Sequence, residues 1–289
     1  MPLGYTGKIL RVDLGNNAIT VEEPDEIFYR RYLGGRGLIA YYLLKEVPTD
    51  ADPLGPENLL IFSGGPVTGV PLPGSGRHSV GAKSPLTGGY GEAEAGGYFG
   101  AELKHAGFDA VILRGIAPKP VYLWVHDGQA EIRDASSLWG TTTGDCQAAL
   151  RRELDDEHVS VASIGPAGEN LVRIACVLND LRASAGRCGL GAVMGSKRLK
   201  AVAVRGHTVP DVANPDKIKE LARFVHDSLE TSSKGLHENG TSGGVPYLNA
   251  ASGLPTRNFQ QGQFEHFERI SGDTMRQTIL INRETCYAC

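Results

Sequence analysis

The last four residues, Cys286-Tyr287-Ala288-Cys289, hold two thiols three positions apart. That spacing lets both sulfurs reach one metal ion or iron–sulfur cluster. A tetrahedral site needs four ligands, so this pair supplies only half of one. We therefore predict an interrupted cluster motif whose other ligands lie in further sequence. Two alternatives stay open: a redox dithiol, although no thioredoxin-like strand and helix flank it, and a solvated tail with two incidental cysteines.

Two glycine-rich segments, 87–97 and 185–197, form a second candidate site. Each leads into or contains the start of a predicted helix. Glycine lets the backbone approach a ligand closely, and free N–H groups at a helix start favour anions. Arg77 and Arg187 add fixed positive charge suited to phosphate. The combination favours one phosphate-bearing ligand gripped between two glycine loops. The alternative is that the glycines only turn the chain and allow tight packing.

Other familiar motifs fail on context or spacing. Residues 35–40 match the dinucleotide fingerprint G-x-G-x-x-A, but a predicted helix precedes them where a strand is required. Residues 191–197 suggest a P-loop, but the spacing is one residue short and Lys197 follows the serine. Neither H-E-x-x-H nor G-x-S-x-G occurs, so the signatures of zinc proteases and of serine hydrolases are missing.

The elements that must position these groups alternate between strands and helices. Alternation of apolar residues predicts a hairpin over 7–22 and another over 121–133 that turns at Asp127-Gly128. Helical patterns lie at 25–33, 38–47, 98–106, 143–155, 216–230 and 271–280. Strand patterns lie at 59–63, 77–83, 108–114, 159–164, 172–177 and 199–205. The two glycine-rich segments and 235–244 are predicted loops, and the texture changes at 206–214, where we place a domain boundary.

Composition limits the class of protein. The chain has 289 residues, a formal net charge of -4, 41% hydrophobic residues and 38 glycines, about 13% glycine against a usual ~7%. Disorder is unexpected at this apolar fraction, and the glycines lack the three-residue period of collagen. No apolar run approaches the ~20 residues of a membrane span, residues 1–14 lack a secretory signal, and mild acidity gives no footprint for nucleic acid. We expect a cytoplasmic globular protein.

The remaining cysteines favour packing roles. Five cysteines without a secretory signal argue against a disulfide scaffold. Cys146 lies in a predicted helix and Cys176 in an apolar run, and both are predicted to be small buried side chains. Cys188 lies in the second glycine-rich segment, where packing is the simpler interpretation and a place near a site is the alternative.

Several long stretches match one family, in family order. They are YLGGRGL at 32–38, KSPLTG at 83–88, AGGYFGAELK at 95–104, ASIGPAGENL at 162–171, GLGAVMGSK at 189–197 and CYAC at 286–289. Through them the sequence resembles the tungsten- or molybdenum-containing aldehyde:ferredoxin oxidoreductases. The resemblance covers the whole chain, and the chain covers about the first half of the family's length.

The resemblance implies an α+β fold. Residues 1–208 would form a β-rich pterin-binding base domain, and residues 209–289 would begin a helical domain, incomplete and ending in a partial [4Fe-4S] motif. The implied cofactors are a tungsten or molybdenum bis-pterin, a magnesium ion that bridges the pterin phosphates, and a [4Fe-4S] cluster. The implied reaction oxidises aldehydes to carboxylic acids. Implied partners are ferredoxin or an iron–sulfur electron-transfer subunit, a small aldehyde and, in a homo-oligomer, further copies of the chain.

Matching motif positions imply roles for individual residues. The implied cofactor contacts are Arg77, Glu94, Gly96, Gly97, Arg182, Ser184, Gly186 and Arg187, and the implied cluster ligands are Cys286 and Cys289. Among these, Glu94 and Ser184 would offer backbone carbonyls to the magnesium ion. Family members often carry Asn where Glu94 stands, which a backbone contact tolerates. A common family pattern has its arginine one place after Arg182, so Arg182 either replaces that contact or does not.

The chain also departs from the family pattern. The family motif continues as C-x-x-C-x-x-x-C with a fourth cysteine far downstream, and neither later cysteine is present. We assign no catalytic acid or base within residues 1–289, and we predict that the isolated chain is inactive. Two alternatives remain: a truncated or split, non-catalytic pterin-binding scaffold, and a relative that reduces aromatic thioesters.

Overall fold

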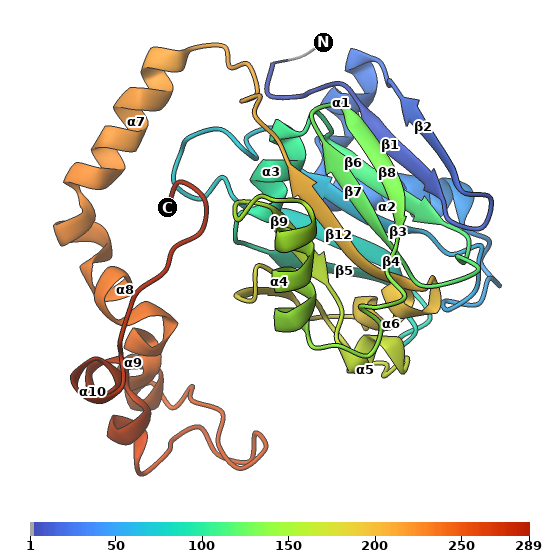
Figure 1. The fold of residues 1–289 in the computed structure, drawn as a ribbon. Helices are drawn as coiled ribbons and strands as arrows, with labels where there is room; N and C mark the ends of the chain where they lie inside the picture. Colours follow the sequence, from blue (N-terminus) through green and yellow to red (C-terminus); the bar gives the residue numbers. More distant parts are fainter. Residues whose placement is uncertain (1–2) are drawn as a thin grey trace. The chain divides into compact units, whose positions relative to one another are not determined.

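The computed structural model describes residues 3–289. The chain forms two compact units (Figure 1). The first runs up to Pro215 and also includes Cys286–Cys289, and the second is Asp216–Thr285. Within residues 3–289 there is no helix with both the length and the apolar content to cross a lipid bilayer.

The first sheet of the first unit has the strand order β2-β1-β6-β3-β4-β5. Its strands are β1 (Ile9–Asp13), β2 (Ala18–Glu22), β3 (Leu60–Gly64), β4 (His78–Lys83), β5 (Tyr90–Ala95) and β6 (Ala110–Arg114). Strands β1 and β6 are parallel, and the other neighbours are antiparallel. The strand β5 therefore lies at an edge of this sheet.

The second sheet has the order β11-β10-β9-β12-β7-β8. Its strands are β7 (Val121–His126), β8 (Gln129–Asp134), β9 (Ser160–Ser163), β10 (Val177–Asn179), β11 (Ala183–Ala185) and β12 (Leu199–Arg205). Only β12 and β7 are parallel. The last strand in the sequence, β12, thus lies in the middle of the sheet, between β9 and β7.

Six helices accompany the sheets of the first unit. They are α1 (Glu26–Tyr32), α2 (Gly35–Glu46), α3 (Phe99–His105), α4 (Thr143–Glu153), α5 (Pro166–Glu169) and α6 (Leu190–Ser196). As the sequence predicts, Asp25 caps α1, with its carboxylate accepting from the Phe28 N–H at 2.8 Å.

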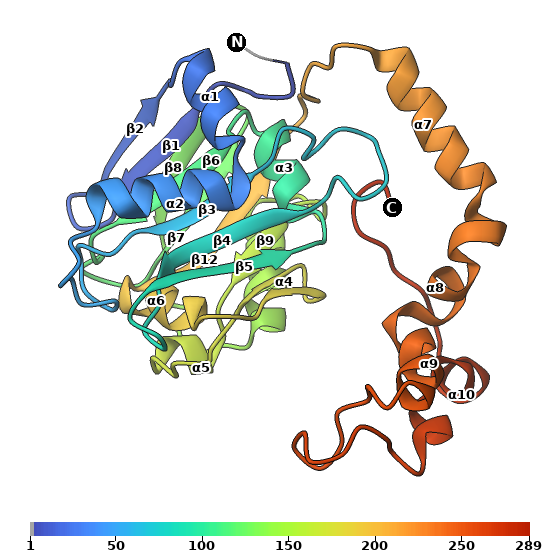
Figure 2. The same cartoon turned by 180° about the vertical axis from the view of Figure 1, so that it is seen from behind.

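The packing follows from strand alternation, because both faces of most strands are apolar. Leu60 and Phe62 of β3 point into a core shared by both sheets, α3 and α6, while Ile61 between them packs with α2. On the second sheet, Leu123 points into the same shared core and Tyr122 packs with α4. The layers are therefore α2, first sheet, second sheet and α4, with α2 over the first sheet in Figure 2.

The second unit is helical. It holds most of α7 (Pro215–Asp227), a π-helix (Leu229–Ser233), α8 (Lys234–Asn239), a 3-10 helix (Gly240–Gly244), α9 (Val245–Ala250), a second 3-10 helix (Phe267–Ile270) and α10 (Gly272–Thr278). The predicted α+β class is confirmed, with the helical part starting at Pro215. The cofactor roles assigned to the two parts stay predictions.

Four local predictions are wrong in part. The first glycine-rich segment contains strand β5, whose Gly91, Ala93 and Ala95 are buried on one face. The predicted strand at 172–177 begins only at its last residue, Val177, and Cys176 is half-buried. The predicted loop 235–244 is helical, whereas α6 in the second glycine-rich segment agrees with the helix start predicted there. Frequent glycine suggested loops at 87–97 and 235–244, where packing makes much of the chain regular, whereas an apolar run suggested a strand at 172–177, where residues 172–176 form turns and irregular structure.

Candidate metal and cofactor site

The terminal cysteines lie at the two ends of a tight turn. The Cys289 N–H donates to the Cys286 carbonyl at 3.1 Å, and Ala288 takes a left-handed conformation with φ 54°. A positive φ at the third position is the mark of a type II turn. Both cysteines are exposed free thiols. No cluster of three or more potential metal-ligating side chains occurs within the described part of the chain, so the turn offers two ligands.

This turn lies on the first glycine-rich segment. The Tyr287 N–H donates to the Gly97 carbonyl at 3.2 Å. A Cβ added to Gly96 would lie 2.8 Å from the Cys286 sulfur, closer than real Cβ atoms approach. The structure therefore brings Cys286 and Gly96, predicted to bind two different groups, into direct contact.

Gly96 and Gly97 also lie against the β10–β11 hairpin, which precedes the second glycine-rich segment. The Asn179 side-chain amide of β10 donates to the Gly96 carbonyl at 2.7 Å. The Asp180 carboxylate accepts from the Ser160 hydroxyl at 2.7 Å and from the Tyr98 N–H at 3.4 Å. Asn179 and Asp180 are both buried. These bonds tie the end of β5 to the β10–β11 hairpin, so an edge strand of the first sheet meets the hairpin at the edge of the second sheet.

Sequence reasoning missed Asn179 and Asp180. The signal that could have found them is a pair of polar residues that closes the apolar run 175–178, just ahead of Arg182. Buried amides and carboxylates in folded proteins have specific hydrogen-bond partners. Here those partners are Gly96 in the first glycine-rich segment and Ser160 in β9.

The predicted contacts in and just before the second glycine-rich segment lie on the exposed side of the chain. Ser184 pairs with Leu178 in the β10–β11 ladder, and Ser184, Gly186 and Arg187 are all exposed. A Cβ on Gly186 would meet only the Ser184 hydroxyl, at 3.3 Å. Arg182 lines a polar cleft of about 490 Å³ together with Tyr287. This side of the hairpin is thus open to a ligand.

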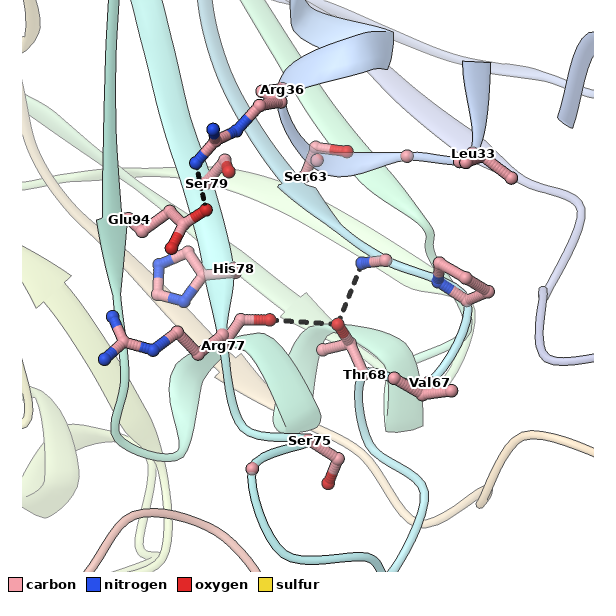
Figure 3. A pocket seen from close by; sticks show the side chains of 15 residues that line it. Leu33, Arg36, Ser63, Val67, Thr68, Ser75, Arg77, His78, Ser79 and Glu94 are labelled. Atoms are coloured by element: carbon pink, nitrogen blue, oxygen red, sulfur yellow. Dashed lines mark hydrogen bonds and ion pairs between the residues drawn. The ribbon is translucent and has the colours of Figure 1, made fainter. Parts of the chain in front are cut away.

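Arg77 and Glu94 line a smaller pocket of about 270 Å³, shown in Figure 3. The Arg77 carbonyl accepts from the Thr68 hydroxyl at 2.9 Å, which fixes the backbone before β4. The Glu94 carboxylate pairs with the Arg36 guanidinium from the start of α2. Arg36 belongs to the glycine motif that fails as a dinucleotide fingerprint, and its guanidinium also lies 3.9 Å from the Glu92 carboxylate.

His78, which follows Arg77, is buried without a polar partner. Its ring lies 5.0 Å from the Phe99 ring, and neither ring nitrogen has a hydrogen-bond partner. Burial lowers the pKa of His78 to about 4, and the nearby Arg77 charge acts in the same direction. The imidazole is therefore neutral in the folded protein at neutral pH.

The burial of His78 predicts a pH dependence of stability. Its pKa is lower in the folded state than its ordinary 6.5, so the unfolded chain binds the proton more readily. The stability that follows from burying a neutral His78 is therefore fully present above pH 6.5 and is lost as the pH falls toward 4. We expect the parent chain to lose about 2 kcal/mol more than His78→Phe between pH 7 and pH 5, measured by urea unfolding. Replacing the exposed His237 by Gln should leave the pH dependence of the unfolding free energy unchanged. If the unfolding free energies of the parent and of His78→Phe fall in parallel with pH, the prediction is contradicted.

Comparison with known proteins decides the family. The family model described as "Aldehyde ferredoxin oxidoreductase, N-terminal domain" matches residues 9–206, and "Aldehyde ferredoxin oxidoreductase, domains 2 & 3" matches residues 217–289. The chain belongs to the aldehyde ferredoxin oxidoreductase family. The predicted family is thereby confirmed, and the two matches divide the chain close to the boundary between its two units.

Individual relatives of this chain support its place in the aldehyde ferredoxin oxidoreductase family. A tungsten-containing aldehyde ferredoxin oxidoreductase of Pyrococcus abyssi is 49% identical over 99% of this chain and 48% of its own length. An aliphatic sulfonate oxidoreductase WOR-like subunit of Pyrococcus furiosus is 38% identical over 92% of this chain and 45% of its length. The chain thus spans about half the length of the curated relatives it matches.

A solved structure shares the fold. The active-site complex BamBC of benzoyl coenzyme A reductase, determined with 1,5-dienoyl-CoA, aligns with a TM-score of 0.78 and 40% identity. The alignment covers 81% of this chain and 36% of that one. Its fold supports the same α+β architecture for the family member described here.

Proposed function

We propose that this chain is the cofactor-binding part of an oxidoreductase that oxidises aldehydes to carboxylic acids. The observation that carries the proposal is the meeting of three segments far apart in the sequence. Gly96 lies against both the Asn179 amide and the Cys286 sulfur. Because the chain spans about half of its curated relatives, the activity of the whole protein is part of the proposal.

The residue types at the predicted contact positions suit a large phosphate-bearing ligand, such as a tungsten or molybdenum bis-pterin. Gly96 and Gly186 carry no side chain where backbone must approach a ligand. Within residues 3–289, the guanidinium groups of Arg77 and Arg187 have neither a hydrogen-bond nor an ion-pair partner, and such groups bind phosphate well. We assign these four residues, with Gly97 and Arg182, as contacts of the pterins.

Two kinds of metal ligand complete the proposed site. Magnesium prefers oxygen ligands, so we assign the backbone carbonyls of Glu94 and Ser184 to an ion between the pterin phosphates. The Glu94 carboxylate is engaged by Arg36, so the backbone carbonyl is the Glu94 oxygen that we assign to this ion. Thiolates hold iron–sulfur clusters, so Cys286 and Cys289 are proposed as the first two ligands of a [4Fe-4S] cluster.

The chemistry then divides between cofactor and protein. When bound, the metal–pterin centre would supply two-electron oxidation chemistry and the cluster would supply one-electron transfer toward ferredoxin or an iron–sulfur subunit. The residues of this chain bind and orient. Arg77 and Arg187 would hold the phosphates, and Gly96 and Gly186 would let the ligand approach the backbone closely. The Cys286–Cys289 turn would place the cluster ligands beside Gly96.

The solved neighbour favours a second candidate, reduction of an aromatic thioester, since that protein is a benzoyl coenzyme A reductase complex. Identity to the aldehyde-named relative is higher, 49% against 40%, and aldehyde oxidation is therefore the first proposal. A non-catalytic scaffold that binds pterin is the third.

The test uses the protein encoded by the reading frame that contains residues 1–289, purified anaerobically from cells supplied with tungstate and molybdate. We expect tungsten or molybdenum and about four iron atoms per chain by elemental analysis, with aldehyde-dependent reduction of viologen. The double variant Arg77→Ala/Arg187→Ala should lose the pterin metal, while Cys286→Ser should lose iron. The 289-residue chain alone should reduce no viologen.

The outcomes separate the candidates. Protein without tungsten, molybdenum or iron contradicts the proposed cofactors. Metal-loaded protein that turns over an aromatic thioester but no aldehyde supports the second candidate, and loaded protein that turns over neither supports the scaffold. Aldehyde oxidation by residues 1–289 alone would show that the essential groups are already present in this chain.

A further inference from the structure

The fold holds Tyr287 more firmly than the cysteines beside it. Tyr287 is half-buried, whereas Cys286 and Cys289 are exposed. Its hydroxyl donates to the Gly69 carbonyl at 3.1 Å, and its N–H donates to the Gly97 carbonyl at 3.2 Å. The side chain and the backbone of Tyr287 are thus fastened to two separate loops of the first unit.

Aromatic contacts fix the orientation of the Tyr287 ring. The ring lies 5.5 Å from the His105 ring at 73° and 6.4 Å from the Tyr98 ring at 86°, and edge-to-face packing of this kind is favourable. The His105 Nε2 also lies 2.8 Å from the Gly69 carbonyl. Because a carbonyl only accepts, the His105 Nε2 donates this bond, and Gly69 anchors both side chains.

Two glycines make room for the turn. A Cβ on Gly76 would lie 3.2 Å from the Tyr287 Cβ, and one on Gly96 would lie 2.8 Å from the Cys286 sulfur. At these two positions the turn therefore packs closely against glycine backbone of the first unit, of which it is a part.

We propose that Tyr287 is a positioning residue for the metal-binding turn. Its docking fixes the directions of the Cys286 and Cys289 thiols and holds Ala288 in its left-handed conformation before any metal arrives. Ligands arranged in advance bind a metal more tightly, because less conformational freedom is lost on binding. The inference rests on the proposed function, in which these two thiolates ligate a cluster.

The experiment measures Cd²⁺ binding to the 289-residue chain under anaerobic conditions. Thiolate-to-cadmium absorbance reports the complex, and a competing chelator sets the scale of affinity. The double variant Cys286→Ser/Cys289→Ser gives the background from the other cysteines. We expect Tyr287→Ala to weaken Cd²⁺ binding about tenfold, in the range seen when groups that support metal ligands are removed.

Two controls separate positioning from general effects. Tyr287→Phe keeps the ring and loses only the bond to Gly69, so it should weaken binding roughly threefold. Tyr247→Ala removes a tyrosine of α9 that is 75% exposed, and its affinity should equal that of the parent. The thermal unfolding midpoint is recorded for each variant, because a loss of fold would lower it together with the affinity.

A second pair of variants tests the turn without touching Tyr287. Gly96→Ala places a Cβ against the Cys286 sulfur and should also weaken Cd²⁺ binding. Gly89→Ala is its control, since a Cβ there meets only the Thr87 hydroxyl, at 4.0 Å. This pair decides the proposal if Tyr287→Ala does not fold.

Each outcome bears on one proposal. Parental affinity in folded Tyr287→Ala, or equal losses in Tyr287→Ala and Tyr247→Ala, would overturn the positioning role. Parental affinity in the double serine variant would show instead that the turn binds no metal, and the cluster assignment in the proposed function would fail.

Discussion

Replacing Asp109 by alanine should cost about 3–5 kcal/mol of unfolding free energy. Asp109 is 2% exposed and pairs with the fully buried Lys104 ammonium at 2.5 Å. Its carboxylate also accepts from the backbone N–H groups of Thr6 and Gly7, at 3.1 and 2.8 Å. The variant leaves a buried charge and two backbone donors unpaired, and urea unfolding followed by circular dichroism measures the loss.

Two further variants show whether the buried charge is the cause. Adding Lys104→Met to Asp109→Ala removes the unpaired ammonium and should recover part of the stability. Glu26→Ala breaks an exposed pair with Arg30, and should change the unfolding free energy by less than about 0.5 kcal/mol. If Asp109→Ala loses no more than Glu26→Ala does, the buried pair is not a main source of stability.

Gly195→Ala should destabilise the first unit by about 3 kcal/mol, at the upper end for overpacked sites. Gly191 and Gly195 lie one turn apart on α6 and face backbone. A Cβ on Gly195 would lie 2.0 Å from the Gly168 carbonyl oxygen of α5, and one on Gly191 would lie 2.4 Å from the Cys176 carbonyl oxygen. No rotamer change relieves a clash with backbone, so the two helices must move apart.

The matched control is Gly144→Ala, in the first turn of α4. A Cβ there meets only the Thr142 hydroxyl, at 3.7 Å, and alanine favours a helix over glycine by up to about 1 kcal/mol. Gly144→Ala should therefore stabilise the protein slightly while Gly195→Ala destabilises it. Equal and small effects would mean that α5 and α6 are not in close backbone contact.

Local signals made part of the fold predictable. The hairpin of β7 and β8 turns at Asp127 and Gly128, with φ values of 40° and 81°, and Asp-Gly is a sequence that favours such a turn. Strand β5 was not predicted from the sequence because Tyr90–Ala95 holds only glycine, alanine and glutamate after its tyrosine. What makes it a strand is antiparallel pairing along β4, a contact that composition does not encode.

The glycines of the two glycine-rich segments have two different roles. Gly191 and Gly195 serve close helix packing, the alternative weighed from the sequence, whereas Gly96 lies at the meeting point of the candidate site. Glycine content alone does not separate these uses, because each depends on what lies opposite.

The candidate site divides in the same way. Cys286, Cys289 and the two arginines are visible as motifs. Asn179 and Tyr287 are not, since their partners lie 83 and 218 residues away in the chain. Side chains whose partners lie far away in the sequence leave no periodic or spaced pattern to find.

The central place of β12 in the second sheet has a consequence for synthesis on the ribosome. The hairpin β7–β8 and the strands β9 to β11 share no ladder until Leu199–Arg205 lies between them. The first sheet, by contrast, has all its strands once Arg114 has emerged. The roughly 90 residues that follow take about 5–20 s to translate. During that time only α3 is available to cover the inner face of the first sheet, and a single late strand completes the second sheet that covers the rest.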